Sequence, residues 1–493
     1  MTTSGAAAPG SLASGVLDEL RAIVGERGLL IAPEDLRTYE CDGLTNFRVM
    51  PRAVLLPAST AEVQAVVRVC HRERIPFVAR GAGTGLSGGA LPVADGIVIS
   101  LARMNRILEV DLQNARMAVE PGVTNLEVTG RVATAGFFYA PDPSSQSVCS
   151  IGGNVAENSG GAHCLKYGFT TTHVLGLEVV LPDGSLAHLG GTTLDAPGYD
   201  LLGVFVGSEG TLGIATKITL RIVKRPQAVQ TLLAAFNTID EAGAAVSDII
   251  AAGVLPAAVE MMDRLSIQAA EAGVHPHYPD CGALLLVELD GPEAEVAALM
   301  ADVDTRCRQN GAWELRVAQS EAERALIWKG RKAAFASMGR IASSYIVQDG
   351  VIPRTALPQV LREIARLSAA AGIRVANVFH AGDGNLHPLV LYDAQVPGEQ
   401  AAAEVLAERI VELCIEQGGS ITGEHGVGEE KKHLMGKMFS EPDLDTMQRV
   451  RCAFDPLHLS NPTKVFPRPR LCGESPGEYM PHPLEIAGIA ERF

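Results

Sequence analysis

The chain has 493 residues, of which 47% are hydrophobic, and its formal net charge at pH 7 is −16. This length predicts two or three domains with a large core, and the composition excludes a disordered chain. A surface this acidic disfavours nucleic acid and anionic membranes as primary partners, but it leaves room for a local basic pocket.

From the sequence we expect neither a secretory signal at the N-terminus nor an Arg-rich transit peptide. The N-terminus has no basic stretch followed by an apolar one, and the longest apolar run, near 244–259, is interrupted by Asp248 and Pro256. A membrane helix needs about 20 clean apolar residues. We therefore expect a cytoplasmic protein with no membrane span. Its nine cysteines form no C-x-x-C pair, which argues for reduced thiols and against an iron–sulfur cluster in this chain.

The first half mixes helices and strands at irregular spacing. Ser59 or Thr60 is a good N-cap for a helix, and Glu62 falls in its first turn. We expect helices at Leu12–Gly28, Thr60–Glu73 and Thr124–Ala135, and strands at Arg52–Leu56, Pro76–Ala79, Gly96–Ser100 and Ala115–Glu120. This mixture favours an α+β fold over a regular doubly wound sheet.

After Pro226 the chain alternates long Ala-rich helices with apolar strands. We expect helices at Ile239–Ala252, Glu293–Gln309, Pro358–Ala371 and Glu399–Gln417, and strands at Thr231–Asn237, Ala283–Leu289, Val375–Phe379 and Pro388–Tyr392. Two helices packed on one antiparallel sheet would satisfy this pattern. The main domain boundary is expected near Arg225–Gln227, and the Pro-rich stretch from Pro467 is expected to be a surface tail.

Three glycine-rich segments lie in the first half. The first, Arg80–Gly89, has five glycines in ten residues, so its backbone N–H groups could approach a phosphate closely. It is neither a Walker loop nor a good Rossmann fingerprint. Two further loops are expected at 141–161 and at Val206–Ile214. One such loop would be read as a tight turn, but three in one domain indicate one long ligand, such as a dinucleotide.

A histidine hairpin carries the strongest chemical signal. His380 and His387 flank a Gly-Asp-Gly-Asn turn inside Val378–Leu391, and Glu424 and His425 follow later. A β-hairpin would bring both imidazoles together, and a His, His, Glu set suits a divalent metal with an open position for substrate. The alternative is a polar turn plus a capped helix.

A basic segment, Trp328–Phe335, contains the candidate anion clamp. The planar guanidinium of Arg331 could grip a carboxylate with two parallel hydrogen bonds. The alternative is that the segment forms a solvated helix face. We expect Lys332 to be a solvated neighbour of Arg331.

Together these segments resemble the vanillyl-alcohol oxidase (p-cresol methylhydroxylase-type, or PCMH-type) flavoproteins. From about Leu30 to Pro467 the chain is similar to their FAD-linked D-2-hydroxyacid dehydrogenase branch, and within it to glycolate oxidase flavoprotein subunits and D-lactate dehydrogenases. The resemblance implies an α+β fold, with a two-subdomain PCMH-type FAD-binding domain and an α+β cap domain with an antiparallel sheet. The implied domains are an N-terminal helix and lead-in (1–45), the FAD-binding domain (46–226), the substrate cap (227–420), a C-terminal helical segment returning to the flavin (421–467) and the tail (468–493).

The resemblance implies FAD as cofactor. Thr84 stands where members with covalent flavin carry a histidine, which favours noncovalent FAD, although Cys149 keeps the covalent alternative open. The expected cofactor-binding residues are Arg80, Gly81, Ala82, Gly83, Thr84, Gly85, Gly88, Gly89, Pro141, Asp142, Gly152, Gly153, Asn154, Asn158, Ser159, Gly160, Gly161, Glu209, Gly210, Gly213, Ile214 and Asn461.

The resemblance also implies roles for the second half. His380, His387 and Glu424 would hold a divalent ion (Zn, Mn or Fe), and Arg331 would bind the substrate carboxylate. His425 would be the catalytic base, or alternatively a supporting or further metal ligand. The implied reaction is metal-assisted deprotonation of a 2-hydroxyl followed by hydride transfer to flavin N5.

Two departures from the 2-hydroxyglutarate-specific members favour a small substrate. Val347 and Leu389 stand where that branch has a Lys and an Asn, so D-lactate or glycolate is expected, with a D-2-hydroxyglutarate dehydrogenase as alternative. Two further alternatives are a glycolate oxidase subunit that is active only with an iron–sulfur partner, and a non-redox enzyme of the alkyl-glycerone-phosphate synthase type. The expected electron acceptor is external, as a quinone, a cytochrome, an electron-transfer flavoprotein or an iron–sulfur subunit, and a homodimer is an open alternative.

Overall fold

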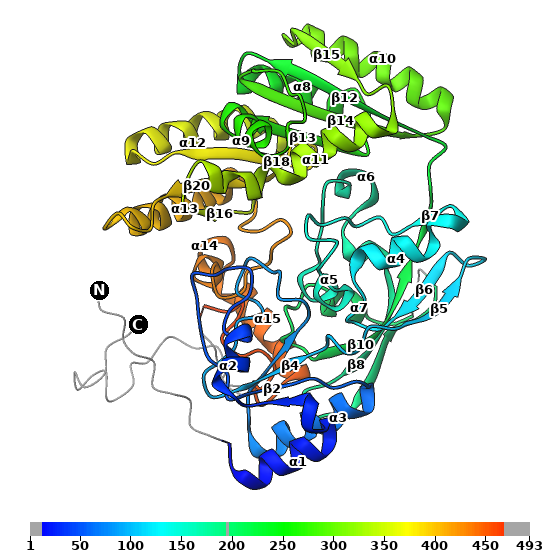
Figure 1. Ribbon diagram of the computed structural model, residues 1–493, viewed down its shortest axis with the longest axis vertical. Helices are drawn as coiled ribbons and strands as arrows, with labels where there is room; N and C mark the ends of the chain where they lie inside the picture. The colour runs from blue at the N-terminus through cyan, green and yellow to red at the C-terminus, as the bar shows by residue number, and fades with distance from the viewer. Residues whose placement is uncertain (1–11, 194–196, 468–493) are drawn as a thin grey trace.

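The structure, a computed structural model, describes residues 12–193 and 197–467, so the expected tail from 468 lies outside the described residues. The chain forms a lower half at its N-terminal end and an upper half built from its middle, and its last helices return to the lower half (Figure 1). This mixed architecture of helices and mainly antiparallel sheets confirms the α+β fold expected from the sequence.

The lower half begins with a four-stranded sheet. Ser59 caps its long helix, because the Ser59 hydroxyl accepts a hydrogen bond from the backbone N–H of Glu62. The strand order is β1 (Leu29–Leu30), β2 (Ala53–Leu55), β4 (Ile97–Ser100) and β3 (Phe77–Arg80), with helices α1 (Ser14–Val24), α2 (Pro33–Leu36) and α3 (Thr60–Glu73). Helices α1 and α3 pack side by side over a core of buried aliphatic residues.

A five-stranded antiparallel sheet completes the lower half. Its order is β5 (Ile107–Asp111), β6 (Arg116–Val119), β10 (Ile214–Arg221), β8 (Val174–Val180) and β9 (Leu186–Gly190); β7 (Phe137–Phe138) pairs with β11 (Val223–Lys224) beside it. Its helices are α4 (Asn125–Val132), α5 (Ile151–Glu157), α6 (Cys164–Tyr167) and α7 (Leu201–Phe205). The second glycine-rich segment was expected to be a loop, and that prediction is wrong for α5. The hydroxyl of Ser150 caps this helix through the N–H of Gly153.

The upper half is built on a nine-stranded sheet. Its path runs β15 (Glu314–Val317), β12 (Ala228–Phe236), β14 (Ala283–Gly291), β13 (Ala258–Asp263), β18 (Val375–His380), β19 (Asn385–Leu386) and β17 (Gly350–Val351), with β16 (Ser344–Val347) on β20 (Pro388–Tyr392) beside β18. The prediction that two helices pack on this sheet is wrong. Helices α8 (Ile239–Ala251), α10 (Glu293–Gln309), α12 (Leu357–Ala371) and α13 (Glu399–Glu416) share one core, and α9 (Arg264–Val274) and α11 (Glu321–Ser337) share another on the opposite face.

The end of the chain joins the two halves. After α13 it passes through the segment that carries Glu424, then α14 (Met435–Met438) and α15 (Glu441–Phe454), back to the first sheet. There Ser460 pairs with Phe77 of β3, and Asn461 donates to the carbonyl oxygens of Gly89 and Glu209. The C-terminal segment therefore ties the first and third glycine-rich segments together.

Candidate active site

The three glycine-rich segments surround one cavity in the lower half. Gly81 lies so close to Ser150 that a Cβ at residue 81 would come within 2.2 Å of the Ser150 hydroxyl oxygen, so only glycine fits there. The expected cofactor residues that line the cavity are Arg80, Gly81, Ala82, Gly83, Thr84, Gly85, Gly89, Gly152, Gly153, Asn154, Ser159, Glu209, Gly210, Gly213 and Ile214. These residues could hold one long ligand.

Seven expected cofactor residues are not among the lining residues: Gly88, Pro141, Asp142, Asn158, Gly160, Gly161 and Asn461. Asn461 still connects two of the segments, as described above. Asp142 instead lies at the interface between the halves, where Oδ2 is 3.0 Å from Nδ1 of His163. The other ring nitrogen of His163 lies 3.2 Å from Glu288 on β14. Burial opposes protonation of His163, but the two carboxylates outweigh it and raise its pKa to about 10.

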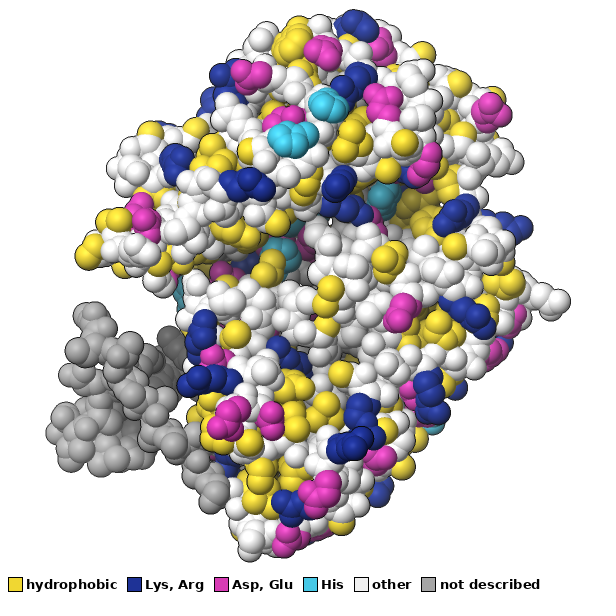
Figure 2. Space-filling model, viewed as in Figure 1, with side chains coloured by type: hydrophobic (Ala, Val, Ile, Leu, Met, Phe, Trp, Pro, Cys, Tyr) yellow, Lys and Arg dark blue, Asp and Glu magenta, His cyan; other side chains and the backbone are white. Residues whose placement is uncertain are grey.

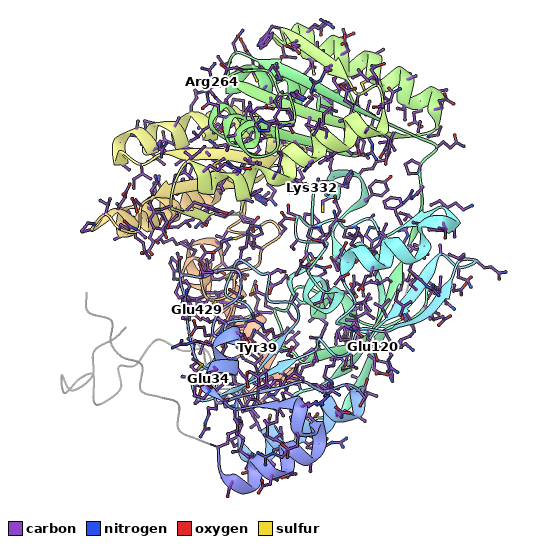
Figure 3. All side chains as sticks on the ribbon, viewed as in Figure 1. Glu34, Tyr39, Glu120, Arg264, Lys332 and Glu429 are labelled. Carbon is purple, nitrogen blue, oxygen red and sulfur yellow. The ribbon has the colours of Figure 1, made fainter. Side chains whose placement is uncertain are left out.

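Lys332 reaches the same interface. Figure 3 shows its label where the upper half faces the lower half, and Nζ lies 3.7 Å from Asp142. It was expected to be a solvated neighbour of Arg331, but it instead makes an ion pair across the two halves. No local pattern predicts this pair, because Asp142 and Lys332 are far apart in the chain.

The histidine hairpin forms as expected. His380 ends β18 and pairs with Asn385 of β19, and the rings of His380 and His387 are 5.1 Å apart. Glu424 joins them from the C-terminal segment: its Oε1 lies 3.3 Å from Nε2 of His380 and 3.2 Å from Nε2 of His387. Ligand atoms around one metal at about 2.0–2.2 Å lie roughly 3–3.5 Å apart. The three side chains could therefore hold one divalent ion.

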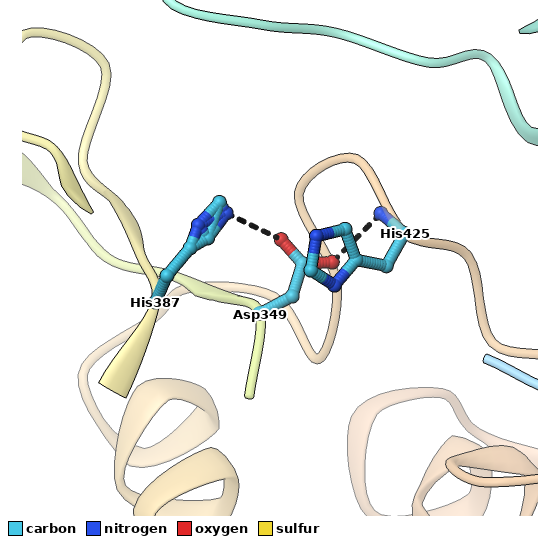
Figure 4. Close-up of side chains that lie close together, drawn as sticks. All are labelled: Asp349, His387 and His425. Atoms are coloured by element: carbon cyan, nitrogen blue, oxygen red, sulfur yellow. Dashed lines mark hydrogen bonds and ion pairs between the residues drawn. The ribbon is translucent and has the colours of Figure 1, made fainter. Parts of the chain in front are cut away.

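A second group of potential ligands shares His387. Asp349, His387 and His425 also have ligand atoms within 4.8 Å of one another (Figure 4). The Asp349 carboxylate, however, already accepts hydrogen bonds from the Thr422 hydroxyl and from the backbone N–H groups of residues 423–425. The ring nitrogens of buried His387, which both groups share, make no hydrogen bond. Because the Asp349 oxygens are already engaged, the set with Glu424 is the better candidate for a metal site, and Asp349 holds the backbone of residues 423–425 in place.

Positively charged neighbours keep the Asp349 carboxylate ionised, which strengthens its hydrogen bonds to the backbone of residues 423–425. Burial opposes ionisation of Asp349, but His425 and Lys431 outweigh burial and hold the pKa of this carboxyl well below its usual range. Its contribution to stability is then complete above the unfolded-state pKa of about 4 and is lost as the pH falls further.

We expect the Asp349→Asn variant to be less stable than the wild type by about 3–5 kcal/mol at neutral pH, because it leaves buried donors and Lys431 without their anion. Thermal unfolding over a pH series measures this, and the gap should narrow below about pH 4. Asp393→Asn, which changes an exposed carboxylate that also caps a turn, is the control and should change little. A gap that did not depend on pH would show that the Asp349 charge is unimportant.

His425 connects the hairpin with the cavity. Its ring stacks on His387, with centroids 5.0 Å apart and planes at 11°. Glu424 and His425 both line the cavity formed by the glycine-rich segments. Figure 2 shows the surface hollowed between the two halves, with histidine side chains inside the hollow. The second half of the chain thus brings a carboxylate and an imidazole to the ligand cavity of the first half.

Arg331 lies on the buried face of α11, together with Ile327 and Ala334. The solvated helix face considered from the sequence is therefore wrong for this residue. Its guanidinium makes an ion pair with Glu260 of β13, at 2.5 Å, and its Nε has no hydrogen-bond partner. Sequence reasoning missed Glu260, although a lone carboxylate inside an apolar strand was a signal that could have revealed it.

Two further findings concern membrane-spanning helices and cysteines as metal ligands. No helix within residues 12–193 and 197–467 has the length and apolarity needed to cross a bilayer. In the same described part of the chain, neither group of potential metal ligands contains a cysteine.

Comparisons with known proteins agree with this geometry. Residues 51–190 match the FAD binding domain family, and residues 225–465 match the C-terminal domain of FAD linked oxidases. The chain is 50% identical over 468 residues to glycolate oxidase subunit GlcD of Escherichia coli (strain K12), covering 95% of this chain and 94% of that protein. It is 31% identical over 461 residues to a D-lactate dehydrogenase of Anaerostipes hadrus, covering 91% and 97%.

Among solved structures, p-cresol methylhydroxylase with substrate bound has a TM-score of 0.77 at 17% identity, covering 93% of this chain and 98% of that one. At this identity the match speaks for the fold alone, and it confirms the PCMH-type architecture expected from the sequence. With both family models and near full-length relatives in agreement, the chain belongs to the FAD-linked oxidase family and is a flavin-dependent oxidoreductase.

Proposed function

We propose that the protein oxidises a small D-2-hydroxy acid, of the glycolate or D-lactate class, to the 2-oxo acid. The observation that carries the proposal is that Glu424 and His425 line the same cavity as the glycine-rich segments. Relatives named for glycolate oxidase and D-lactate dehydrogenase support the substrate class.

The residues fit the two groups that this chemistry needs. FAD, when bound, would supply the two-electron acceptor, and His380, His387 and Glu424 would hold a divalent ion whose chemistry is to acidify the substrate hydroxyl. Arg331 has an unpaired buried Nε with which to bind the substrate carboxylate. His425 accepts the hydroxyl proton at its imidazole, beside both the cavity and the metal ligands.

The apolar strand pair β16–β20 supports a small substrate. Val347 lies directly opposite Leu389, and Leu389 is fully buried on a strand that continues from His387. A second carboxylate of a longer acid would find no cation at either position, and burying it unpaired would be costly. We therefore favour glycolate or D-lactate over D-2-hydroxyglutarate.

The purified, flavin-loaded chain should reduce an artificial dye with glycolate or D-lactate. With the carboxylate on Arg331 and the hydroxyl on the metal ligands, only one enantiomer can turn its C2 hydrogen toward the flavin, so L-lactate should react far more slowly than D-lactate. D-2-hydroxyglutarate should also react slowly, because Val347 and Leu389 offer its second carboxylate no cation. Steady-state kcat/KM for the four acids measures this. Equal rates for both lactate enantiomers, or a preference for the dicarboxylate, would contradict the assignment.

We also propose that the FAD is held noncovalently. Cys149 lines the cavity, but burial raises the pKa of its thiol, and its sulfur lies 3.5 Å from the amide nitrogen of Asn154. A thiol with a raised pKa is a poor nucleophile for linkage to a flavin. Acid precipitation should leave all the FAD in the supernatant, as measured by its absorbance. Yellow colour in the pellet that is lost in Cys149→Ser would contradict this.

We propose that the electrons leave to an external acceptor, because the described cysteines do not form a cluster site. The relative named as a subunit of glycolate oxidase makes an iron–sulfur partner one candidate, beside a quinone, a cytochrome or an electron-transfer flavoprotein. The isolated chain can be assayed with an artificial dye and with a quinone. If it reduces the dye but not the quinone, a partner subunit is favoured as the acceptor.

A further inference from the structure

Glu260 is a buried carboxylate in the middle of an apolar strand. Every residue of β13 is buried, and Glu260 pairs in register with His380 of the neighbouring strand β18. Its Oε1 lies 2.7 Å from Nδ1 of His380, and its Oε2 lies 2.5 Å from a terminal nitrogen of Arg331. One carboxyl group thus contacts both a metal-ligand candidate and the candidate clamp.

We infer that Glu260 is a positioning residue that sets the spacing between the metal and the carboxylate clamp, and thereby selects acids with the hydroxyl on the carbon next to the carboxylate. This inference rests on the proposed function. Glu260 is not among the residues that line the cavity, so it acts through His380 and Arg331.

The contact with His380 fixes the form of the imidazole. An ionised carboxylate only accepts hydrogen bonds, so Nδ1 of His380 donates to Glu260, and Nε2 is the ring nitrogen left to face a metal ion. Nε2 points to the ligand set, since it lies 3.3 Å from Glu424. Such carboxylates behind a ligating histidine typically strengthen metal binding about 10–100-fold. Neither ring nitrogen of His387 makes a hydrogen bond, so of the two imidazoles it is His380 that Glu260 orients.

The contact with Arg331 neutralises a buried cation. Arg331 is 3% exposed, and an unpaired guanidinium at that depth would be strongly unfavourable. The ion pair with Glu260 keeps the Arg331 guanidinium charged and buried before substrate binds. The Nε of Arg331 remains without a hydrogen-bond partner and can donate to the substrate. Because both contacts go to one carboxyl group, the guanidinium and the metal-ligand imidazole stay close together. That spacing fits a 2-hydroxy acid, whereas a 3-hydroxy acid has one carbon more between the two groups.

The test uses flavin-loaded wild type, Glu260→Gln and Asp263→Asn. Asp263 is the matched control, because it is a buried carboxylate on the same strand that binds Ser266 and Asn377 instead of the site. Metal-stripped protein is titrated with Mn²⁺ against a fluorescent chelator. We expect Glu260→Gln to weaken Mn²⁺ binding about 10–100-fold and Asp263→Asn to leave it nearly unchanged. The ratio of kcat/KM for glycolate to that for 3-hydroxypropanoate should fall in Glu260→Gln only.

If Glu260→Gln does not fold, the double variant Glu260→Gln/Arg331→Met removes the uncompensated cation and should restore folding, while Mn²⁺ binding stays weak. Mn²⁺ affinity within about threefold of wild type in either variant would overturn the inference and leave the proposed function intact. A wild type that binds no Mn²⁺, Zn²⁺ or Fe²⁺ would overturn the proposed metal and this role of Glu260 together.

Discussion

Replacing Arg331 by alanine is expected to lower kcat/KM for glycolate or D-lactate by about 30- to 5,000-fold, or about 2–5 kcal/mol. The side chain is buried, and its removal takes away the partner of the substrate carboxylate while leaving Glu260 as a buried anion whose remaining contact is His380. Repulsion between that anion and the substrate adds to the loss. Steady-state kinetics with an artificial dye measures the effect, and flavin absorbance verifies that the variant is folded.

Lys332→Ala is the matched control for this prediction. Lys332 is the next residue on α11, but its side chain is 37% exposed and lies 3.7 Å from Asp142 rather than at the site. An exposed ion pair is worth about 0–1 kcal/mol, so this variant should lose less than about fivefold. If Arg331→Ala also kept its kcat/KM within about fivefold, Arg331 would not be the carboxylate clamp.

The Glu424→Gln variant is expected to lower kcat by about a thousandfold or more. It removes the anionic member of the ligand set, and a Lewis acid contributes several kcal/mol to the transition state. The flavin should remain bound, because most of the residues around its cavity belong to the glycine-rich segments. Metal content per flavin and kcat are measured on the same sample.

Glu429→Gln is the control, since Glu429 lies on the same segment but pairs with Lys432 instead of the histidines. Chelator-treated wild type should behave like Glu424→Gln and should recover when Zn²⁺, Mn²⁺ or Fe²⁺ is added back. Normal turnover by protein shown to be free of metal would rule out the metal-assisted step.

The local parts of the site were predictable from the sequence. The turn between His380 and His387 is short and rich in glycine, so the hairpin and the proximity of its two imidazoles follow from neighbouring residues. Arg331 and Glu424 were matched through resemblance to known proteins. Helix α3 begins where Ser59 predicts, because the cap is a local interaction.

The parts that were missed depend on contacts distant in sequence. Glu260 meets His380 through a strand pairing between residues 120 positions apart, which no local pattern reveals. The expected second glycine loop proved to contain helix α5, because the Ser150 cap together with the burial of Ile151 and Val155 outweighs the low helix propensity of its glycines. Asp142 was assigned to the cofactor from a loop pattern, whereas docking of the two halves brings it to His163 and Lys332.

We expect the histidine–carboxylate cluster to act on a flavin held by the glycine-rich segments. The decisive experiment is anaerobic mixing of the purified, flavin-loaded protein with glycolate or D-lactate. We predict that one of these acids bleaches the flavin absorption band, and that the bleaching stops when the metal is removed. A flavin that neither acid reduces would show that the cluster does not act on it. A flavin that is reduced equally fast without metal would show that the metal takes no part in the reaction.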